Sequence, residues 1–347
     1  MKIFYSEAHL AHNPPFEVFD GGMRVPNLEA PERATRILTS LQKTDWAEIA
    51  APFDFGLDPI LSVHDDDYVN YLASAWSEWL ETNPEVSDAN DKSALLPATF
   101  PPAGWRHRPA GLLGRAGYYM MDLSAPIVEG TYKAALASAN CALSAAKSVS
   151  EGQRAAFALC RPPGHHAGRA NCGGYCYLNN AAIAANWLTS LKSKTALLDI
   201  DYHAGNGTQD IFYQRADVLT ISIHADPTFE YPYFSGYANE SGAGAGLGFH
   251  RNFPLPAGTV EAAYLETLDQ ALQLIRDFAP AYLVLSAGMD IYESDPLGKI
   301  KVSRAGISEI GRRIAGLGLP TAIVMEGGYN NEALGENVVR LLGAFIR

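Results

Sequence analysis

Four apolar runs that each lead into a metal-binding or proton-transferring side chain limit most strongly how this chain can fold. The runs, each with the side chain it leads to, are 195–201 (His203), 218–223 (His224), 282–286 (Asp290) and 321–325 (Tyr329). Continuous apolar runs bounded by glycine and polar residues are typical of strands buried on both faces, and therefore of a parallel sheet. In open α/β sheets, ligands bind beyond the carboxyl ends of the strands. The sequence thus predicts an active site at that edge of a parallel sheet.

The length and composition favour one large domain. The chain has 347 residues, of which 48% are hydrophobic, and no linker or repeat divides it. From about residue 130, predicted strands and helices alternate, which indicates an α/β fold with helices on both faces of the sheet. The segment from about 82 to 117 differs, because it holds five prolines and little periodicity. We expect it to be a long inserted loop within a single domain of residues 1–347.

Charge and hydropathy exclude several classes of partner. A net charge of −12 argues against non-specific nucleic-acid binding, which needs a basic surface. No apolar run approaches the ~20 residues that span a bilayer. The N-terminus lacks the apolar core of a signal peptide, and the four cysteines are too few for a disulfide framework. These features predict a cytoplasmic protein that binds neither nucleic acid nor membrane.

A carboxylate and an imidazole follow the first run. Asp201 and His203 are two residues apart at a strand end, so their side chains leave on the same side. Together they make part of a site for a divalent transition metal, although a capping aspartate and a core histidine would give the same pair. Asp290, beyond another strand, adds a third ligand. Three ligands leave coordination positions open for water and substrate, which is typical of a catalytic site.

The tandem His165-His166 follows Arg-Pro-Pro-Gly, a stretch with a restricted backbone. Hydrolysis needs a general base for water and an acid for the leaving group, and two histidines can divide that work. Each ring needs an orienting partner, for which Asp199 and Asn206 are candidates. The alternatives are that the pair ligates metal or is a polar turn.

Tyr329 follows Glu326-Gly-Gly, and the two glycines let this backbone approach the site closely. A phenol there can donate a hydrogen bond to an oxyanion. The alternative is an ordinary packing residue.

Six short stretches together carry a resemblance to a known family. They are 161–167 (RPPGHHA), 173–180 (GGYCYLNN), 199–203 (DIDYH), 205–209 (GNGTQ), 286–290 (SAGMD) and 326–329 (EGGY). The set resembles the histone deacetylase family of zinc amidohydrolases over nearly the whole chain. The stretches 117–119, 207–213 and 226–232 make it most similar to the bacterial acetylpolyamine amidohydrolases.

The resemblance implies an arginase/deacetylase-like fold with a central parallel sheet of about eight strands. The implied catalytic residues are His165, His166, Tyr329, Asp199 and Asn206, with one Zn²⁺ on Asp201, His203 and Asp290. A structural K⁺ or Na⁺ would bind Asp199, Asp201, His203, Ser222 and Ile223. Gly174, Tyr175 and Phe229 would line a narrow tunnel for a linear amine. In the polyamine branch, a partner subunit's loop narrows that tunnel, so we expect residues 82–117 to lie at a homodimer interface.

Two positions depart from the family pattern. Ala204 stands where the family commonly has a second histidine after the metal-binding one. Leu113 stands near the position where polyamine-selective members carry an acidic residue suited to a distal ammonium. Glu17, Asp20 and Asp122 are the candidates to replace that residue.

The sequence therefore predicts a zinc enzyme that hydrolyses small N-acetylated amines such as acetylputrescine and acetylcadaverine. The alternatives are a deacetylase of acetyl-lysine, an amidase of another small N-acyl compound, and a binding module without activity. A two-manganese ureohydrolase is the remaining one, but Met289 and Ala204 occupy positions where a second metal needs ligands.

Overall fold

The computed structural model describes residues 1–19, 22–84, 93–105, 107–191 and 193–346. Within these ranges, eight parallel strands form one sheet in the order β4-β1-β5-β10-β9-β6-β7-β8. The strands are β1 (Lys2–Phe4), β4 (Glu48–Ala50), β5 (Ala155–Ala158), β6 (Thr195–Asp199), β7 (Val218–Ala225), β8 (His250–Leu255), β9 (Tyr282–Ala287) and β10 (Thr321–Met325). A separate antiparallel pair joins β2 (Glu17–Phe19) to β3 (Met23–Val25). The predicted α/β fold with a parallel sheet of about eight strands is confirmed.

The apolar runs form the central strands because both faces of the sheet are covered. In β6, Ala196 and Leu198 pack into one hydrophobic core, and Leu197 between them packs into the other. In β9, Leu283 packs into the same core as Ala196, and Val284 packs into the same core as Leu197. Period-two alternation sends successive side chains to opposite faces. Both faces are buried here, so the successive residues in the middle of each strand are all apolar.

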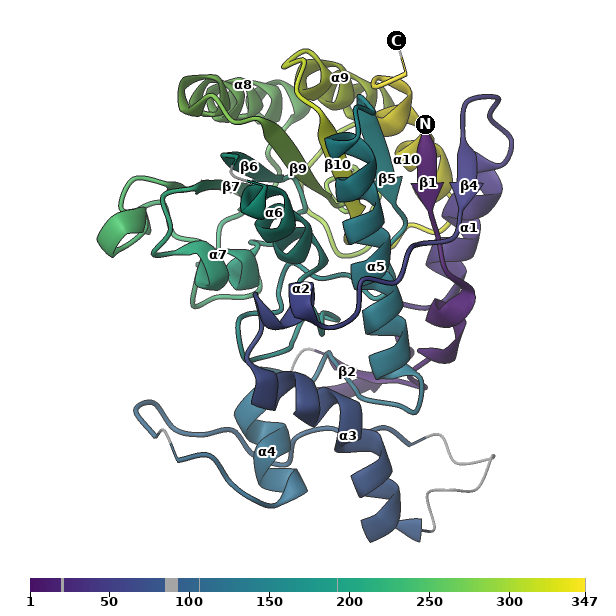
Figure 1. The fold of residues 1–347 in the computed structure, drawn as a ribbon, viewed down its shortest axis with the longest axis vertical. Helices are drawn as coiled ribbons and strands as arrows, with labels where there is room; N and C mark the ends of the chain where they lie inside the picture. Colours follow the sequence, from purple (N-terminus) through teal and green to yellow (C-terminus); the bar gives the residue numbers. More distant parts are fainter. Residues whose placement is uncertain (20–21, 85–92, 106, 192, 347) are drawn as a thin grey trace.

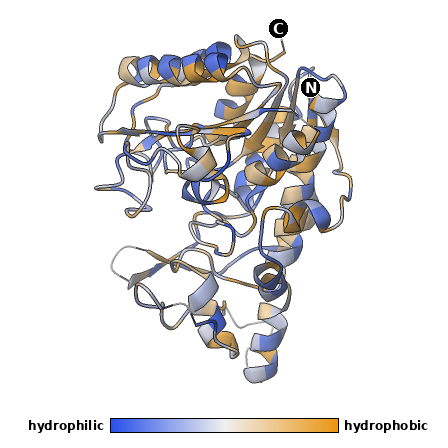
Figure 2. Cartoon of the chain, turned by 60° about the vertical axis from the view of Figure 1, so that its left-hand side comes forward, coloured by the Kyte–Doolittle hydropathy of each residue, from blue (hydrophilic) through white to orange (hydrophobic). Residues whose placement is uncertain are grey.

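Helices cover the sheet on both sides (Figure 1). The helices are α1 (Glu32–Leu41), α2 (Asp58–Leu61), α3 (Asp66–Thr82), α4 (Leu112–Tyr119), α5 (Thr131–Ser150), α6 (Asn180–Ser190), α7 (Asn206–Phe212), α8 (Glu261–Phe278), α9 (Arg304–Ala315) and α10 (Leu334–Gly343). Helices α1, α8, α9 and α10 pack into one core, and α3, α5 and α6 pack into the other. Figure 2 shows apolar residues gathered along the strands and many polar residues on the outer helices.

The segment from 82 to 117 is not a continuous loop, because α4 begins within it at Leu112. It packs on its own chain: Arg115 pairs with Glu78 of α3, and Leu95 exchanges backbone hydrogen bonds with Ile127. Residues 85–92 and 106 lie outside the described ranges. Helices α3 and α4 lie away from the sheet, in the lower part of Figure 1.

No helix in the described part of the chain is long and apolar enough to cross a membrane.

Candidate active site

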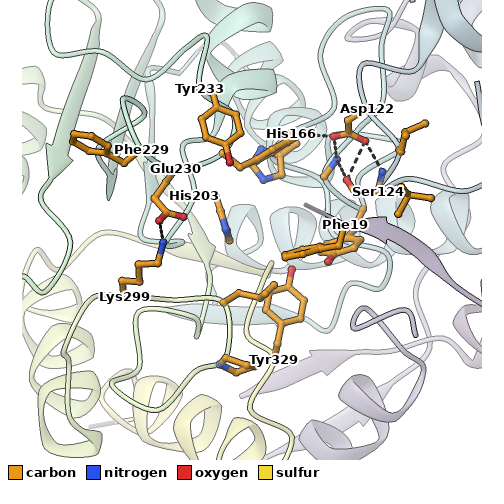
Figure 3. A pocket seen from close by; sticks show the side chains of 17 residues that line it. Phe19, Asp122, Ser124, His166, His203, Phe229, Glu230, Tyr233, Lys299 and Tyr329 are labelled. Atoms are coloured by element: carbon orange, nitrogen blue, oxygen red, sulfur yellow. Dashed lines mark hydrogen bonds and ion pairs between the residues drawn. The ribbon is translucent and has the colours of Figure 1, made fainter. Parts of the chain in front are cut away.

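A cavity of about 410 Å³ lies among the segments that follow β6, β7, β9 and β10 (Figure 3). Its volume falls in the range of small-molecule sites. The polar and charged side chains that line it include His166, His203, Tyr329, Asp122, Glu230 and Lys299. Its aromatic walls include Phe19, Tyr175, Phe229, Tyr231 and Tyr233. This position is the one that the parallel sheet predicts.

The structure brings Asp201, His203 and Asp290 together beyond two neighbouring strands. β6 and β9 pair in register, with Asp199 opposite Ser286, so their carboxyl ends meet. One ligand atom from each of the three side chains lies within 4.8 Å of the others. The His203 Nδ1 atom is 3.2 Å from Asp201 Oδ1 and 3.2 Å from Asp290 Oδ2.

Hydrogen bonds hold both carboxylates so that oxygen atoms face this common centre. Asp201 Oδ2 accepts a hydrogen bond from the Gly327 amide at 2.8 Å, and Asp290 Oδ1 accepts one from Tyr202 at 2.9 Å. The second oxygen of Asp290, Oδ2, is buried and accepts no hydrogen bond from the described residues. A buried polar atom in this state is costly unless a cation satisfies it. The donor set of two carboxylates and one imidazole therefore fits a divalent metal.

The protonation equilibria also favour a cation at this centre. Burial and the Asp201 carboxylate raise the pKa of Asp290 to about 7. Burial lowers the pKa of His203, but the two carboxylates outweigh it and raise that pKa to about 10. Two buried carboxylates that face one point repel each other, and positive charge relieves that repulsion.

Space at the centre is limited by the approach of the β10 loop. A Cβ atom at Gly327 would lie 2.5 Å from Asp290 Oδ2 and 2.6 Å from Asp201 Oδ2. Only glycine lets the backbone pass this close to both carboxylates.

The two adjacent histidines each have a different orienting partner. His165 Nδ1 is 2.9 Å from Asp199 Oδ2, and His166 Nδ1 is 2.7 Å from Asn206 Oδ1. The rings lie side by side, with their centroids 3.9 Å apart. The sequence analysis proposed these two partners, and the structure places both within hydrogen-bonding distance.

The partners give the two rings different charges. Burial lowers the pKa of both rings, but the Asp201 and Asp199 carboxylates raise the pKa of His165 to about 10. Burial and the nearby charge of His165 hold the pKa of His166 well below its usual range. Because the amide oxygen of Asn206 can only accept, the neutral His166 ring carries its hydrogen on Nδ1. Its Nε2 lone pair is therefore able to take up a proton.

Tyr329 lines the cavity from the loop after β10. Its backbone amide donates a 2.6 Å hydrogen bond to Asp295 Oδ2, and the guanidinium carbon of Arg33 lies 4.8 Å from the centre of its ring. Burial holds the pKa of Tyr329 well above its usual range, although the Arg33 charge lowers it. The phenol is therefore neutral and able to donate a hydrogen bond.

Gly174 and Tyr175 form another wall, and both have positive φ angles, of 52° and 67°. A Cβ atom at Gly174 would lie 2.3 Å from Cδ2 of His166, so no other residue fits there. The Gly174 amide donates to Asp122 Oδ2 at 2.8 Å.

Of two residues predicted to contact the substrate, Phe229 lines the cavity and Glu17 does not. Phe229 lines the cavity, but its side chain is 74% exposed. Glu17 is fully buried and does not line the cavity; its Oε1 accepts from the Leu28 amide at 2.8 Å, and its carboxylate is hydrogen-bonded to Tyr175. Glu17 thus supports the Tyr175 wall. Asp20 lies outside the described residues.

Four further residues line the cavity and were not predicted from the sequence: Tyr231, Tyr233, Glu230 and Lys299. The Tyr231 ring lies edge-on to His166, with centroids 4.8 Å apart. Glu230 and Lys299 form an ion pair at the cavity (Figure 3). Glu230 and Tyr231 fall in the stretch 226–232, whose resemblance to the polyamine branch was the available signal. No pattern in the sequence marked Lys299.

Ser222 is suited to contact a monovalent cation. It lies opposite Asp199 in the pairing of β6 with β7. His224 Nε2 is 2.8 Å from the Gly236 carbonyl, so it carries the hydrogen, and His224 Nδ1 accepts from Ser222 Oγ at 2.7 Å. The Ser222 oxygen also accepts from the Gly205 amide at 3.5 Å, which leaves one lone pair for a cation beside the Asp199 carboxylate.

Comparison with known proteins finds relatives over nearly the whole chain. A histone deacetylase domain matches residues 27–345. The chain is 45% identical over 349 residues to acetylpolyamine amidohydrolase 1 of Pseudomonas aeruginosa, covering 99% of each chain. It is 41% identical over 344 residues to the acetylpolyamine amidohydrolase of Mycoplana ramosa, covering 99% of this chain and 98% of that one. A crystal structure of acetylpolyamine aminohydrolase from Burkholderia pseudomallei matches with a TM-score of 0.91 and 41% identity, covering 99% of this chain and 98% of that one.

These matches confirm the resemblance seen in the six sequence stretches. The relatives are amidohydrolases, so the chain is an enzyme that hydrolyses amides. It belongs to the histone deacetylase family.

Proposed function

We propose that this enzyme hydrolyses the amide of small N-acetylated amines and releases acetate and the free amine. Acetylpolyamines and acetyldiamines, such as acetylputrescine and acetylcadaverine, are the proposed substrates. The observation that carries the proposal is a cavity of about 410 Å³ whose aromatic walls adjoin the carboxylate and imidazole groups. The relatives named acetylpolyamine amidohydrolases, which match over nearly their whole length, support it.

One Zn²⁺ is the proposed metal, held by Asp201, His203 and Asp290. When bound, it would supply Lewis-acid activation of the amide carbonyl and of water. A second transition metal at this centre would need more ligands, and the neighbouring positions hold Met289 and Ala204, which offer none. A structural K⁺ or Na⁺ is proposed beside Asp199, Ser222 and Ile223.

His166, His165 and Tyr329 have different roles in the proposed hydrolysis. The neutral His166 accepts a proton from the attacking water at Nε2, and Asn206 holds its ring in the required tautomer. The His165 imidazolium, paired with Asp199, supplies positive charge and a proton for the leaving nitrogen. The Tyr329 phenol donates a hydrogen bond to the developing oxyanion. The aromatic walls exclude water from a slender alkyl chain.

A substrate panel tests this proposal. The zinc-loaded enzyme is assayed with acetylputrescine, acetylcadaverine, N8-acetylspermidine and an acetyl-lysine peptide. We expect kcat/KM for the small acetylated amines to exceed the value for the peptide at least tenfold. The proposal fails if the peptide is the better substrate, or if none of the four is hydrolysed.

We also propose a homodimer. Phe100, Trp105 and Leu113, all within the predicted insertion, are 41%, 72% and 55% exposed. Exposed large apolar groups in one segment are typical of an interaction surface. Sedimentation should give the mass of two chains, and Trp105→Glu should shift it towards one. Leu57→Glu, at an exposed apolar residue outside this segment, is the control, and a wild-type monomer would refute the dimer.

A further inference from the structure

The cavity contains an uneven set of charges. Among the described residues that line it, three side chains other than histidines and tyrosines are ionisable: Asp122, Glu230 and Lys299. Glu230 and Lys299 pair with each other (Figure 3). The three together carry one net negative charge at neutral pH. The three side chains together would therefore balance one positive charge on a bound substrate.

The ion pair stands on two anchored loops. In the loop after β7, the Phe229 and Glu230 amides both donate to the Asp226 carbonyl at 3.1 Å. In the loop after β9, the Lys299 carbonyl accepts from Gly258 at 2.9 Å. The Glu230 side chain is 14% exposed and the Lys299 side chain is 59% exposed. The backbone thus holds the pair at the outer part of the cavity, with the carboxylate inward of the ammonium.

Asp122 differs from Glu230, because the hydrogen bonds that it accepts come from uncharged donors. Oδ1 accepts from the amide and the hydroxyl of Ser124, at 2.9 Å each. Oδ2 accepts from the Gly174 amide at 2.8 Å and the Tyr231 hydroxyl at 2.6 Å. These donors orient the carboxylate without cancelling its charge. Asp122 is therefore the lining carboxylate that attracts a substrate cation.

Resting on the proposed function, we infer that this charge set selects N-acyl amines that carry one free ammonium group. Asp122 attracts the first ammonium of a substrate. The ion pair between Glu230 and Lys299 gives a second ammonium no unpaired carboxylate, and Lys299 repels it. For unit charges within roughly 10 Å at a partly exposed site, this repulsion changes a ratio of rates by about 3- to 10-fold. An N-acyl diamine is thus favoured over an N-acyl triamine.

Three substrates with matched chains test the inference. They are N-butylacetamide without a charge, N-acetylputrescine with one ammonium, and N8-acetylspermidine with two. Each carries a chain of four carbon atoms on the amide nitrogen. The zinc-loaded wild type should show a higher kcat/KM for acetylputrescine than for N8-acetylspermidine. High salt should reduce this difference, because it screens exposed charges.

Two variants of Lys299 separate charge from packing. In Lys299→Met, the ratio of kcat/KM for N8-acetylspermidine to that for N-butylacetamide should rise about fivefold. In Lys299→Arg, which keeps the charge, the ratio should stay within about twofold of the wild type. Glu230→Gln should lower kcat/KM for both cationic substrates relative to N-butylacetamide.

Two results would overturn the charge selection. One is an equal change for all three substrates in Lys299→Met, and the other is an arginine variant that behaves like the methionine variant. If the wild type hydrolyses none of the three, the proposed function itself fails, and the charge selection fails with it. If N-butylacetamide is hydrolysed but substrate charge has no effect, only the charge selection fails.

Discussion

The Tyr231 hydroxyl donates a 2.6 Å hydrogen bond to Asp122 Oδ2, while the same tyrosine ring lies edge-on to His166. The same carboxylate oxygen accepts from Gly174, which begins the opposite wall. This partly buried contact therefore links two walls of the cavity to the ring proposed as the general base. The width of the cavity and the position of that base depend on each other.

Tyr231→Phe should lower kcat/KM for acetylputrescine roughly two- to tenfold, because it removes one hydrogen bond and keeps the ring. Most of the loss should appear in KM, since the phenylalanine ring still packs against His166. Tyr237→Phe is a matched control, because it removes the hydrogen bond that the Tyr237 hydroxyl donates to the Tyr233 carbonyl in the same loop. Steady-state kinetics decide the matter, and equal losses in both variants would show that the contact with Asp122 has no special role.

Tyr329→Phe should lower kcat by ~10²–10³-fold, since one oxyanion donor has about that effect. Zinc content and thermal stability should stay near the wild type, because the phenylalanine ring can still stack with Arg33. Pre-steady-state and steady-state turnover with acetylputrescine provide the measurement. Near-normal turnover would remove Tyr329 from the mechanism.

Asp295 should position Tyr329 through the backbone. Its Oδ2 accepts from the amides of Tyr329 and Asn330 at 2.6 and 3.0 Å, and its Oδ1 accepts from Leu297 at 3.0 Å. Asp295→Ala should lower kcat about 10- to 100-fold by loosening a loop that must hold the phenol in place.

A double variant separates positioning from general damage. When Tyr329→Phe has already removed the hydroxyl, Asp295→Ala should lower kcat by less than about threefold further, because the two residues act on one step. Additive losses in the double variant would mean that Asp295 acts elsewhere.

Stability should fall as the pH is lowered from about 6.5 to about 4. Burial lowers the pKa of His64 and of His250 to about 4. Unfolding returns each ring to a pKa of about 6.5, so in this window the unfolded chain binds more protons than the folded one. The free energy of unfolding should therefore decrease by up to about 1.4 kcal/mol per pH unit for each histidine. Above about pH 6.5, these two rings no longer make the free energy of unfolding depend on pH.

His64→Gln isolates one of these contributions. His64 Nδ1 is 2.9 Å from the Gly168 carbonyl and Nε2 accepts from the Asn179 amide at 2.9 Å, and glutamine offers one donor and one acceptor in their place. In urea unfolding at pH 5, 6 and 7, the free energy of unfolding of this variant should depend less steeply on pH than that of the wild type. His107→Gln, at an exposed site, should leave the slope unchanged. An unchanged slope in His64→Gln would contradict the neutral buried ring.

The central strands were predictable from the sequence, but the edges of the sheet were not. β6, β7, β9 and β10 are buried on both faces, so their apolar runs stand out. β4 and β8 lie at the two edges, and β8 carries the exposed Arg251 between buried neighbours. An edge strand faces water, so its sequence resembles that of a loop.

The grouping of Asp201, His203 and Asp290 and the pair of histidines were predictable for the same reason, because strand ends place them. Asp201 and Asp290 follow strands that are neighbours in the sheet, and short spacing fixes His203 relative to Asp201. The residues of the cavity wall have no regular spacing in the sequence. In the irregular loop after β7, nothing in the sequence tells that Tyr231, two residues beyond Phe229, packs against His166. Lys299 enters the cavity from a separate loop, so only the folded chain shows its pairing with Glu230.

Zinc content and turnover should be measured on the same preparations of wild type and Asp290→Ala. We expect one zinc per wild-type chain and active hydrolysis of acetylputrescine. Asp290→Ala should lose both the metal and the activity, because Asp290 supplies one of three ligands. Two stoichiometric transition metals per wild-type chain, or an Asp290→Ala variant that turns over substrate without zinc, would contradict these expectations.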